Sequence, residues 1–134
     1  MIMIQPPSPI RAALILAAIA LGAAGHGQFV DKGTIDSVQV AYRWAFPKGQ
    51  PELLLRLRNT ASMDRQAALT IDLFYQGRTI ETFEADTCIR AGQALTGKLN
   101  GIYFRPKRIT AAQVKDGSAE VDVTRTEITA SPCP

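Results

Sequence analysis

Side chains able to carry catalysis are scarce in this sequence of 134 residues, which contains one His and two Cys. Ser–His–Asp and Cys–His mechanisms need an imidazole to move a proton, and catalytic zinc normally takes two or three His ligands. The single His, His26, lies at the predicted end of an export segment, which makes it a poor candidate for either role. No glycine-rich phosphate-binding loop follows a predicted strand. The sequence therefore predicts no catalytic residue, no metal ligand and no cofactor.

The best candidates for carboxylate chemistry are Glu81, Glu84 and Asp86. In a strand, Glu84 and Asp86 share a face, and a bulge would bring Glu81 near them. Such a group can hold Ca²⁺ or act as an acid–base pair, which would make the protein a hydrolase. Calcium loops carry a denser set of Asp, Asn and Gly, so a solvated strand face is the preferred interpretation.

A compact basic patch next to an aromatic pair is the predicted interaction site. Its members are Tyr103, Arg105, Lys107 and Arg108, and Arg43, Arg56 and Arg58 join it if their strands share an outer face. Aromatic rings beside cations can bind nucleic acid, but the net charge of the whole chain is only +3. An exported protein also rarely meets nucleic acid. Ordinary solvated charge is the preferred interpretation of these residues, as it is for the carboxylates. As an interaction site, the patch predicts another envelope or secreted protein as the partner, with anionic lipid or polysaccharide as alternatives.

The first 27 residues have the pattern of a secretory signal peptide. Arg11 precedes an uninterrupted apolar run, Ala12 to Ala24, which is shorter than the roughly 20 residues of a transmembrane helix. Small residues allow cleavage after Ala24, Gly25 or Gly27, and no Cys follows the run for lipid attachment. We expect an exported, periplasmic or secreted protein that does not span the membrane, with residues 28–134 as one domain. A short buried helix is the alternative for the apolar run.

The two cysteines, Cys88 and Cys133, are expected to form a disulfide because an exported chain reaches an oxidising compartment. The bridge would close a long loop, which chain-entropy estimates make worth about 4 kcal/mol. Redox pairs usually lie close together in sequence, so a structural bridge is the preferred interpretation over a redox or metal site.

Alternating apolar residues dominate the chain from Ile35 onward and predict β-strands. The first predicted hairpin joins the strands Val38 to Phe46 and Leu53 to Leu57. In the second, a tight turn at Gln76-Gly77 joins the strand Leu69 to Tyr75 to the strand Arg78 to Ala85. Ile80 and Phe83 have opposite parity in that strand, which indicates a bulge or a change of exposed face.

The rest of the chain predicts shorter elements. Gly92 and Gly97 bracket a short strand, and Asn100-Gly101 predicts a two-residue turn into a return strand, Ile102 to Phe104. Thr110 and Gln113 have the spacing of a capping box for a short helix near residues 110–116. A last strand follows, Glu120 to Thr129.

About seven strands and one small helix predict an all-β, two-layer antiparallel sandwich. In strand number and spacing the chain resembles the immunoglobulin-like and fibronectin-like modules of bacterial envelope proteins. Such a resemblance implies a small binding or accessory module that acts by protein–protein interaction, through a strand edge or the loop from Arg105 to Arg108. A glycan-binding module is the alternative. Its aromatic platform would be Trp44, Tyr42 and Phe46, for which core packing is the preferred interpretation, or one of the turn-proximal Tyr75, Tyr103 and Phe104. A hydrolase or a protease inhibitor is a weaker alternative.

Overall fold

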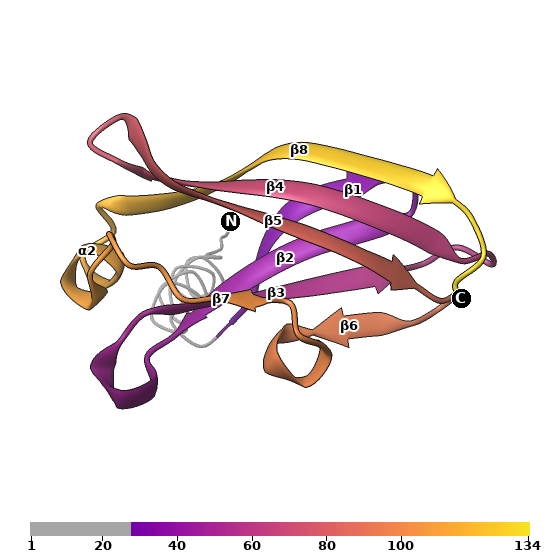
Figure 1. Cartoon of the computed structure of the whole chain (residues 1–134), viewed down its shortest axis with the longest axis horizontal. Helices are drawn as coiled ribbons and strands as arrows, with labels where there is room; N and C mark the ends of the chain where they lie inside the picture. Colours follow the sequence, from indigo (N-terminus) through magenta and orange to yellow (C-terminus); the bar gives the residue numbers. More distant parts are fainter. Residues whose placement is uncertain (1–27) are drawn as a thin grey trace, which may run out of the picture.

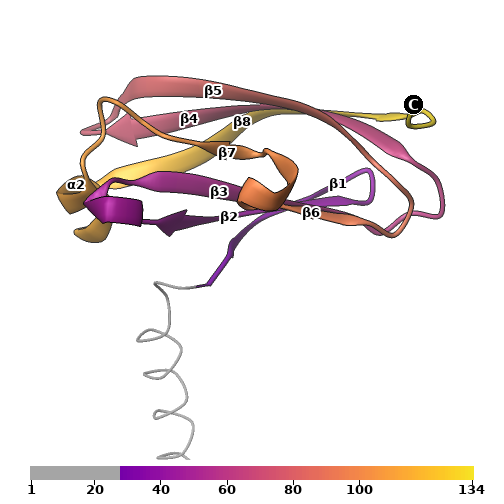
Figure 2. The same ribbon diagram turned by 60° about the horizontal axis from the view of Figure 1, so that its bottom comes forward.

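The computed structural model describes residues 28–134, which form two antiparallel β-sheets packed face to face with one short α-helix (Figure 1, Figure 2). The elements are β1 (Val30–Ile35), β2 (Val38–Ala45), the 3-10 turn η2 (Pro47–Gly49), β3 (Glu52–Asn59), β4 (Arg65–Tyr75), β5 (Arg78–Ile89), β6 (Ala94–Thr96), the 3-10 turn η3 (Gly97–Asn100), β7 (Tyr103–Phe104), α2 (Ala111–Lys115) and β8 (Ala119–Ala130). Sheet A has the order β1–β2–β3–β6, with β7 also on β3, and sheet B has the order β5–β4–β8. The predicted two-layer all-β fold is confirmed, with eight strands in the described chain. The predicted signal peptide lies outside these residues.

The core between the sheets comes from the alternation that the sequence predicts. Its fully buried members include Val38 of β2, Leu53, Leu55 and Leu57 of β3, and Leu69, Ile71 and Leu73 of β4. Full burial of one such side chain contributes about 1.5–3 kcal/mol. Because a slip of one residue would turn a strand's whole apolar set to solvent, this pattern also specifies the pairing register.

Two hairpins use tight turns in which both central residues have positive φ. Gln76 (φ 54°) and Gly77 (φ 75°) join β4 to β5, as the sequence predicts. Asp36 (φ 46°) and Ser37 (φ 70°) join β1 to β2. The strand β1 is not predicted, because all six of its residues are exposed and its turn carries no Gly.

The prediction that Asn100-Gly101 turns one strand back on another is wrong. The strands β6 and β7 do not pair with each other; both pair with β3, so they follow one another along the same sheet edge. Between them η3 interrupts the edge, and Gly101 (φ 73°) ends this 3-10 turn. The positive φ that Gly supplies is used to end a turn of helix and not to reverse the chain.

Extra residues bend both outer strands of sheet B. Leu73 pairs with Glu81 and Phe74 with Thr79, which leaves Ile80 as the predicted bulge in β5. A second bulge leaves Thr124 of β8 without a register partner. Such bulges twist an edge and limit how far another strand can pair along it.

The helix α2 begins with the predicted capping box. The Thr110 hydroxyl accepts the Gln113 N–H at 3.2 Å, and the Gln113 side chain accepts the Thr110 N–H at 2.9 Å. None of the helices within residues 28–134 is long and apolar enough to cross a membrane.

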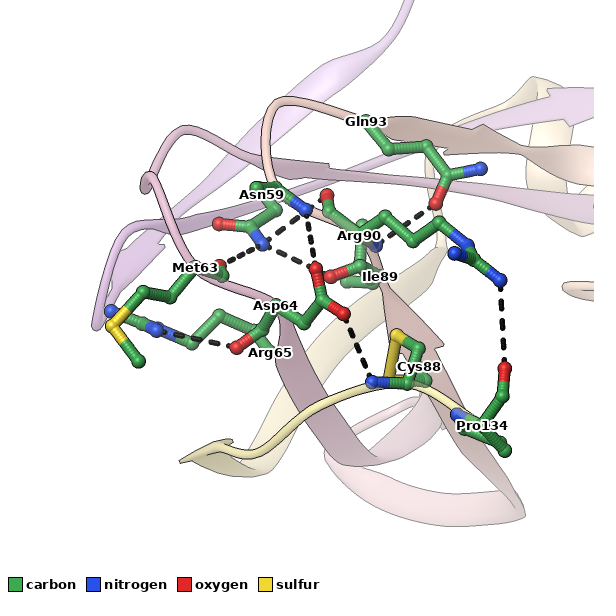
Figure 3. Close-up of a disulfide and its surroundings, with 11 residues drawn as sticks. Asn59, Met63, Asp64, Arg65, Cys88, Ile89, Arg90, Gln93 and Pro134 are labelled. Atoms are coloured by element: carbon green, nitrogen blue, oxygen red, sulfur yellow. Dashed lines mark hydrogen bonds between the residues drawn. A yellow bond between two sulfur atoms is a disulfide. The ribbon is translucent and has the colours of Figure 1, made fainter.

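A disulfide joins β5 to the C-terminal segment (Figure 3). Cys88 and Cys133 are bonded, with an S–S distance of 2.06 Å, which confirms the predicted pair. The carboxylate of Asp64 accepts the backbone N–H groups of Cys133 and Ala91, each at 2.9 Å. The bridge ties the chain end to β5, and Asp64 connects the loop that precedes β4 to the chain end and to the loop after β5.

Candidate functional site

The predicted interaction patch is built around a buried carboxylate. Glu52 at the start of β3 is only 2% exposed, and its Oε2 accepts the Arg105 Nε–H at 2.8 Å. Lys98 Nζ lies 3.4 Å from its Oε1. Both cations also lie over the ring of Tyr103, 5.6 Å (Arg105) and 5.8 Å (Lys98) from its centroid. The hydrogen bond to Glu52 raises the pKa of Arg105, so this guanidinium stays charged in its ion pair with the buried carboxylate.

The other two members of the patch lie where the chain leaves sheet A for sheet B. The backbone N–H groups of Lys107 and Arg108 donate to the Glu81 carboxylate, each at 2.9 Å, and Arg108 Nη1 donates to the Ile80 carbonyl at 3.3 Å. Their side chains remain exposed. The loop is therefore anchored by β5, and it covers part of the free edge of that strand.

The three predicted carboxylates do not form one group. The register pairs Glu81 with the buried Leu73, so it lies on the inner side of sheet B. Glu84 pairs with Thr70 and therefore lies on the outer side, as does Asp86. Among residues 28–134 no three His, Cys, Asp or Glu side chains are placed to share a metal ion. The geometry thus offers no convergent acid–base pair that includes Glu81.

A groove of about 720 Å³ opens on the side of the sandwich flanked by β1 and β8. Its volume falls within the range of typical small-ligand sites. The groove is lined by Lys32 of β1, Tyr42 and Trp44 of β2, Phe74 of β4, Val114 of α2, Gly117, and Ala119 to Asp122 of β8. The opposite side of the sandwich is closed, because Phe83 of β5 stacks on Phe104 of β7 with ring centroids 4.7 Å apart.

Alternation along the strands places three aromatic rings at this groove. Tyr42 and Trp44 lie on the inner face of sheet A, beyond the fully buried Val38, and both are half-buried. Phe74 has the opposite parity to Leu73, so its ring reaches the groove from the outer face of sheet B. The ammonium of Lys32 lies 5.9 Å from the Tyr42 ring centroid, and burial raises the pKa of the Tyr42 hydroxyl.

The open edge of β8 runs along the groove. Within the described chain β8 pairs with β4 only, although it is 12 residues long. Its segment from Ala119 to Asp122 lines the groove and precedes the bulge at Thr124. Every second residue of an edge strand directs its N–H and C=O away from the sheet. Free backbone groups and aromatic rings therefore occur side by side.

The glycan interpretation rests on aromatic residues that the structure separates. Trp44 and Tyr42 line the groove, whereas Phe46 lies beside it under Lys115, whose Nζ is 4.7 Å from the ring centroid. Tyr75 packs against the core, and Tyr103 lies on the outer face of sheet A under two cations.

Sequence reasoning did not find the other residues of the groove. Lys32, Glu120 and Asp122 come from the two ends of the described chain and meet only through the stacking of the sheets. Phe74 carried one local signal, since it is an apolar residue at an outward position of an alternating strand.

The described chain is an antiparallel β-sandwich with a groove beside an open strand edge. Comparisons with protein-family models, with curated proteins and with solved structures find no match to this chain.

Proposed function

We propose that this chain is an exported accessory module of the bacterial envelope that binds a protein partner by pairing an extended segment with β8. One observation carries the proposal: the free edge of β8 adjoins an aromatic groove of about 720 Å³. In strand addition, main-chain hydrogen bonds supply affinity and pockets for alternate side chains supply specificity. Residues 119–122 combine free main-chain groups with a groove for side chains.

The two sides of β8 suggest the chemistry of the partner. One set of alternate side chains of an added strand would lie near Tyr42 and Trp44, in the mouth of the sandwich. The other set would lie near Phe74, Glu120 and Asp122. A segment that alternates apolar or aromatic residues with Lys or Arg fits this arrangement.

The disulfide supports the expectation of export. Bonds of this kind persist in oxidising compartments such as the periplasm and the extracellular space. The bond between Cys88 and Cys133 thus agrees with the predicted signal peptide.

Binding of synthetic peptides tests the proposal. Peptides that alternate aromatic residues with Lys should bind, and copies N-methylated at alternate backbone positions should not, because methylation removes the pairing N–H groups. Trp44→Ala should raise the Kd about thirtyfold, which corresponds to about 2 kcal/mol. Asp122→Lys should also weaken binding, because it repels the basic residues without touching the core. Thr129→Ala, at the far end of β8, is the matched control and should leave the Kd unchanged.

Hydrogen exchange then locates the added strand. We expect alternate backbone amides between Ala119 and Val123 to become protected when the peptide binds, because only the outward N–H groups of β8 gain partners. Equal affinity for the N-methylated peptide, or binding without protection in β8, would contradict strand addition.

A glycan is the second candidate ligand for the same groove. The combination of Tyr42, Trp44 and Phe74 with the carboxylates Glu120 and Asp122 favours it, because sugars offer both an apolar face and hydroxyl donors. An oligosaccharide would lose affinity on Trp44→Ala and would leave the exchange of the β8 amides unchanged. This outcome separates the two ligands.

A further inference from the structure

The outer face of sheet B is strongly acidic. The register of β4 with β5 and β8 identifies the outward residues, since they pair with the outward residues of β4. Six carboxylates share this face: Asp72, Glu84, Asp86, Glu120, Asp122 and Glu127. Arg125 is the one cation among the outward strand residues of this face, and it forms an ion pair with Glu127.

The outer face of sheet A has the opposite sign. Its cations are Arg43 of β2, Arg56 and Arg58 of β3, Lys98 of η3 and Arg105. Glu52, which also points to this side, is almost fully buried and is neutralised by Lys98 and Arg105. Asp31 of β1 accepts the Gly33 N–H at 2.8 Å. The solvent therefore meets mainly positive charge on this face.

Like charges lie close together on both faces. Asp72 and Asp122 stand directly opposite each other in the register of β4 and β8. On sheet A, the guanidinium groups of Arg43 and Arg56 both lie over the Phe29 ring, 5.4 and 4.5 Å from its centroid. The Thr82 hydroxyl donates to Asp72 at 2.7 Å, and the Phe29 ring contacts both arginines, but neither contact supplies an opposite charge. Like charges directly opposite in a sheet are destabilising. A counter-charge from outside the molecule would relieve the repulsion on each face.

We propose that a second copy of this chain supplies that counter-charge, with the basic face of sheet A docked on the acidic face of sheet B of the next molecule. Both faces are outer surfaces of open sheets, and their charges are complementary. Each face also offers an apolar contact: Leu99 beside Lys98 is 89% exposed, and Phe74 is half-buried on sheet B. Because the two faces differ, the contact is head-to-tail and can repeat along a row of molecules.

Sedimentation velocity on the purified protein tests this proposal. The sedimentation coefficient should rise with protein concentration at about 0.01 M salt, where the Debye length is about 30 Å. The rise should disappear at about 1 M salt, where that length is about 3 Å. Phe74, Glu120 and Asp122 belong to both the acidic face and the groove, so the informative substitutions are made at residues outside the groove.

Two charge-reversal variants make the test specific. The acidic-face variant is Glu84→Lys with Asp86→Lys, and the basic-face variant is Arg56→Glu with Arg58→Glu. Each variant alone should remain monomeric. An equimolar mixture should form a discrete one-to-one complex, because each partner retains the face that the other lacks. A symmetric dimer would not give this result, and circular dichroism would establish that both variants fold.

Three results would overturn the proposal: a monomeric wild type at low salt, self-association of either variant alone, or a mixture without a complex. An anionic membrane surface is the alternative ligand of the basic face, and vesicles of anionic lipid test it. Binding of these vesicles by a wild type that remains monomeric would assign the basic face to a membrane surface and exclude the second copy. The charge-reversal substitutions lie outside the groove, so peptide binding at β8 can be measured on monomeric variants and either proposal can fail without the other.

Discussion

Asn59 is a fully buried polar residue at the end of β3, close to the disulfide (Figure 3). Its Nδ2 donates to the carbonyls of Met63 at 2.9 Å and Ile89 at 3.0 Å, and its Oδ1 accepts the Ala61 N–H at 2.9 Å. One side chain thereby bonds backbone groups of the loop after β3 and of the end of β5. Buried polar groups without partners cost about 1–3 kcal/mol each.

We therefore expect Asn59→Ala to lower the free energy of unfolding by about 2–4 kcal/mol. Urea denaturation followed by circular dichroism measures this change. Thr129→Ala, an exposed substitution, should change it by less than about 0.5 kcal/mol. Similar losses in the two variants would show that the Asn59 network does not stabilise the corner.

Asp64 makes the same corner sensitive to acid. Hydrogen bonds from the backbone N–H groups of Cys133 and Ala91 lower the pKa of Asp64 below its usual value of 3.8. A carboxyl group whose pKa is lower in the folded state stabilises the protein above its unfolded pKa. This stabilisation is lost as the pH falls through the folded pKa. The folded protein should therefore lose stability progressively below about pH 5.

Asp64→Asn should reduce the slope of stability against pH in this acidic range. Asp116 contributes in the same direction, because hydrogen bonds from Ser118 lower its pKa. Thermal unfolding at a series of pH values measures the slope, and Asp36→Asn, at the exposed turn between β1 and β2, is the matched control. An unchanged slope in Asp64→Asn would refute this role.

At the scale of elements, strands with one buried face were predictable and the irregular edges were not. The alternating Leu residues of β3 and β4 predicted both strands, since burial follows the period of two. Burial gives β1 no such pattern, because it lies at an edge with every residue exposed. The error at Asn100-Gly101 has a related cause: a positive φ serves a hairpin or the end of a 3-10 turn equally well. Only pairing with β3 decides between them.

The candidate groove shows the same limit. The alternation of β2 predicts that Tyr42 and Trp44 share the inward face of their strand, and the structure places them where that face reaches the groove. Lys32 and Asp122 lie on strands at opposite ends of the described chain, so no local pattern connects them. Their proximity follows from the packing of sheet A on sheet B, which is a property of the whole fold.

The disulfide affects β8, because it ties the segment after this strand to the end of β5. Replacing both Cys88 and Cys133 by Ser should lower the free energy of unfolding by about 2–4 kcal/mol. Hydrogen exchange should quicken first near Ala130, the end of β8 next to the lost bond, and least near Val121 in the core. Uniform quickening along β8 would mean that the bond stabilises the whole domain without holding this end.

At the scale of the whole molecule, net charge is a poor guide to how this protein binds to charged surfaces. The full chain carries +3, which suggests a mildly basic protein. The register instead sorts six carboxylates onto the outer face of sheet B and most nearby cations onto sheet A. Local potential, rather than the sum of charges, determines adsorption and encounter at short range.

Ion-exchange chromatography detects this separation of charge in the monomer. At about pH 8 and about 0.01 M salt, both a cation exchanger and an anion exchanger should retain the protein, because each resin meets a face of opposite sign. Glu84→Lys with Asp86→Lys should abolish retention on the anion exchanger and strengthen retention on the cation exchanger. Arg56→Glu with Arg58→Glu should have the reverse effect. A wild type held by the cation exchanger alone would mean that the six carboxylates do not act as one surface, and head-to-tail docking would then lack its acidic half.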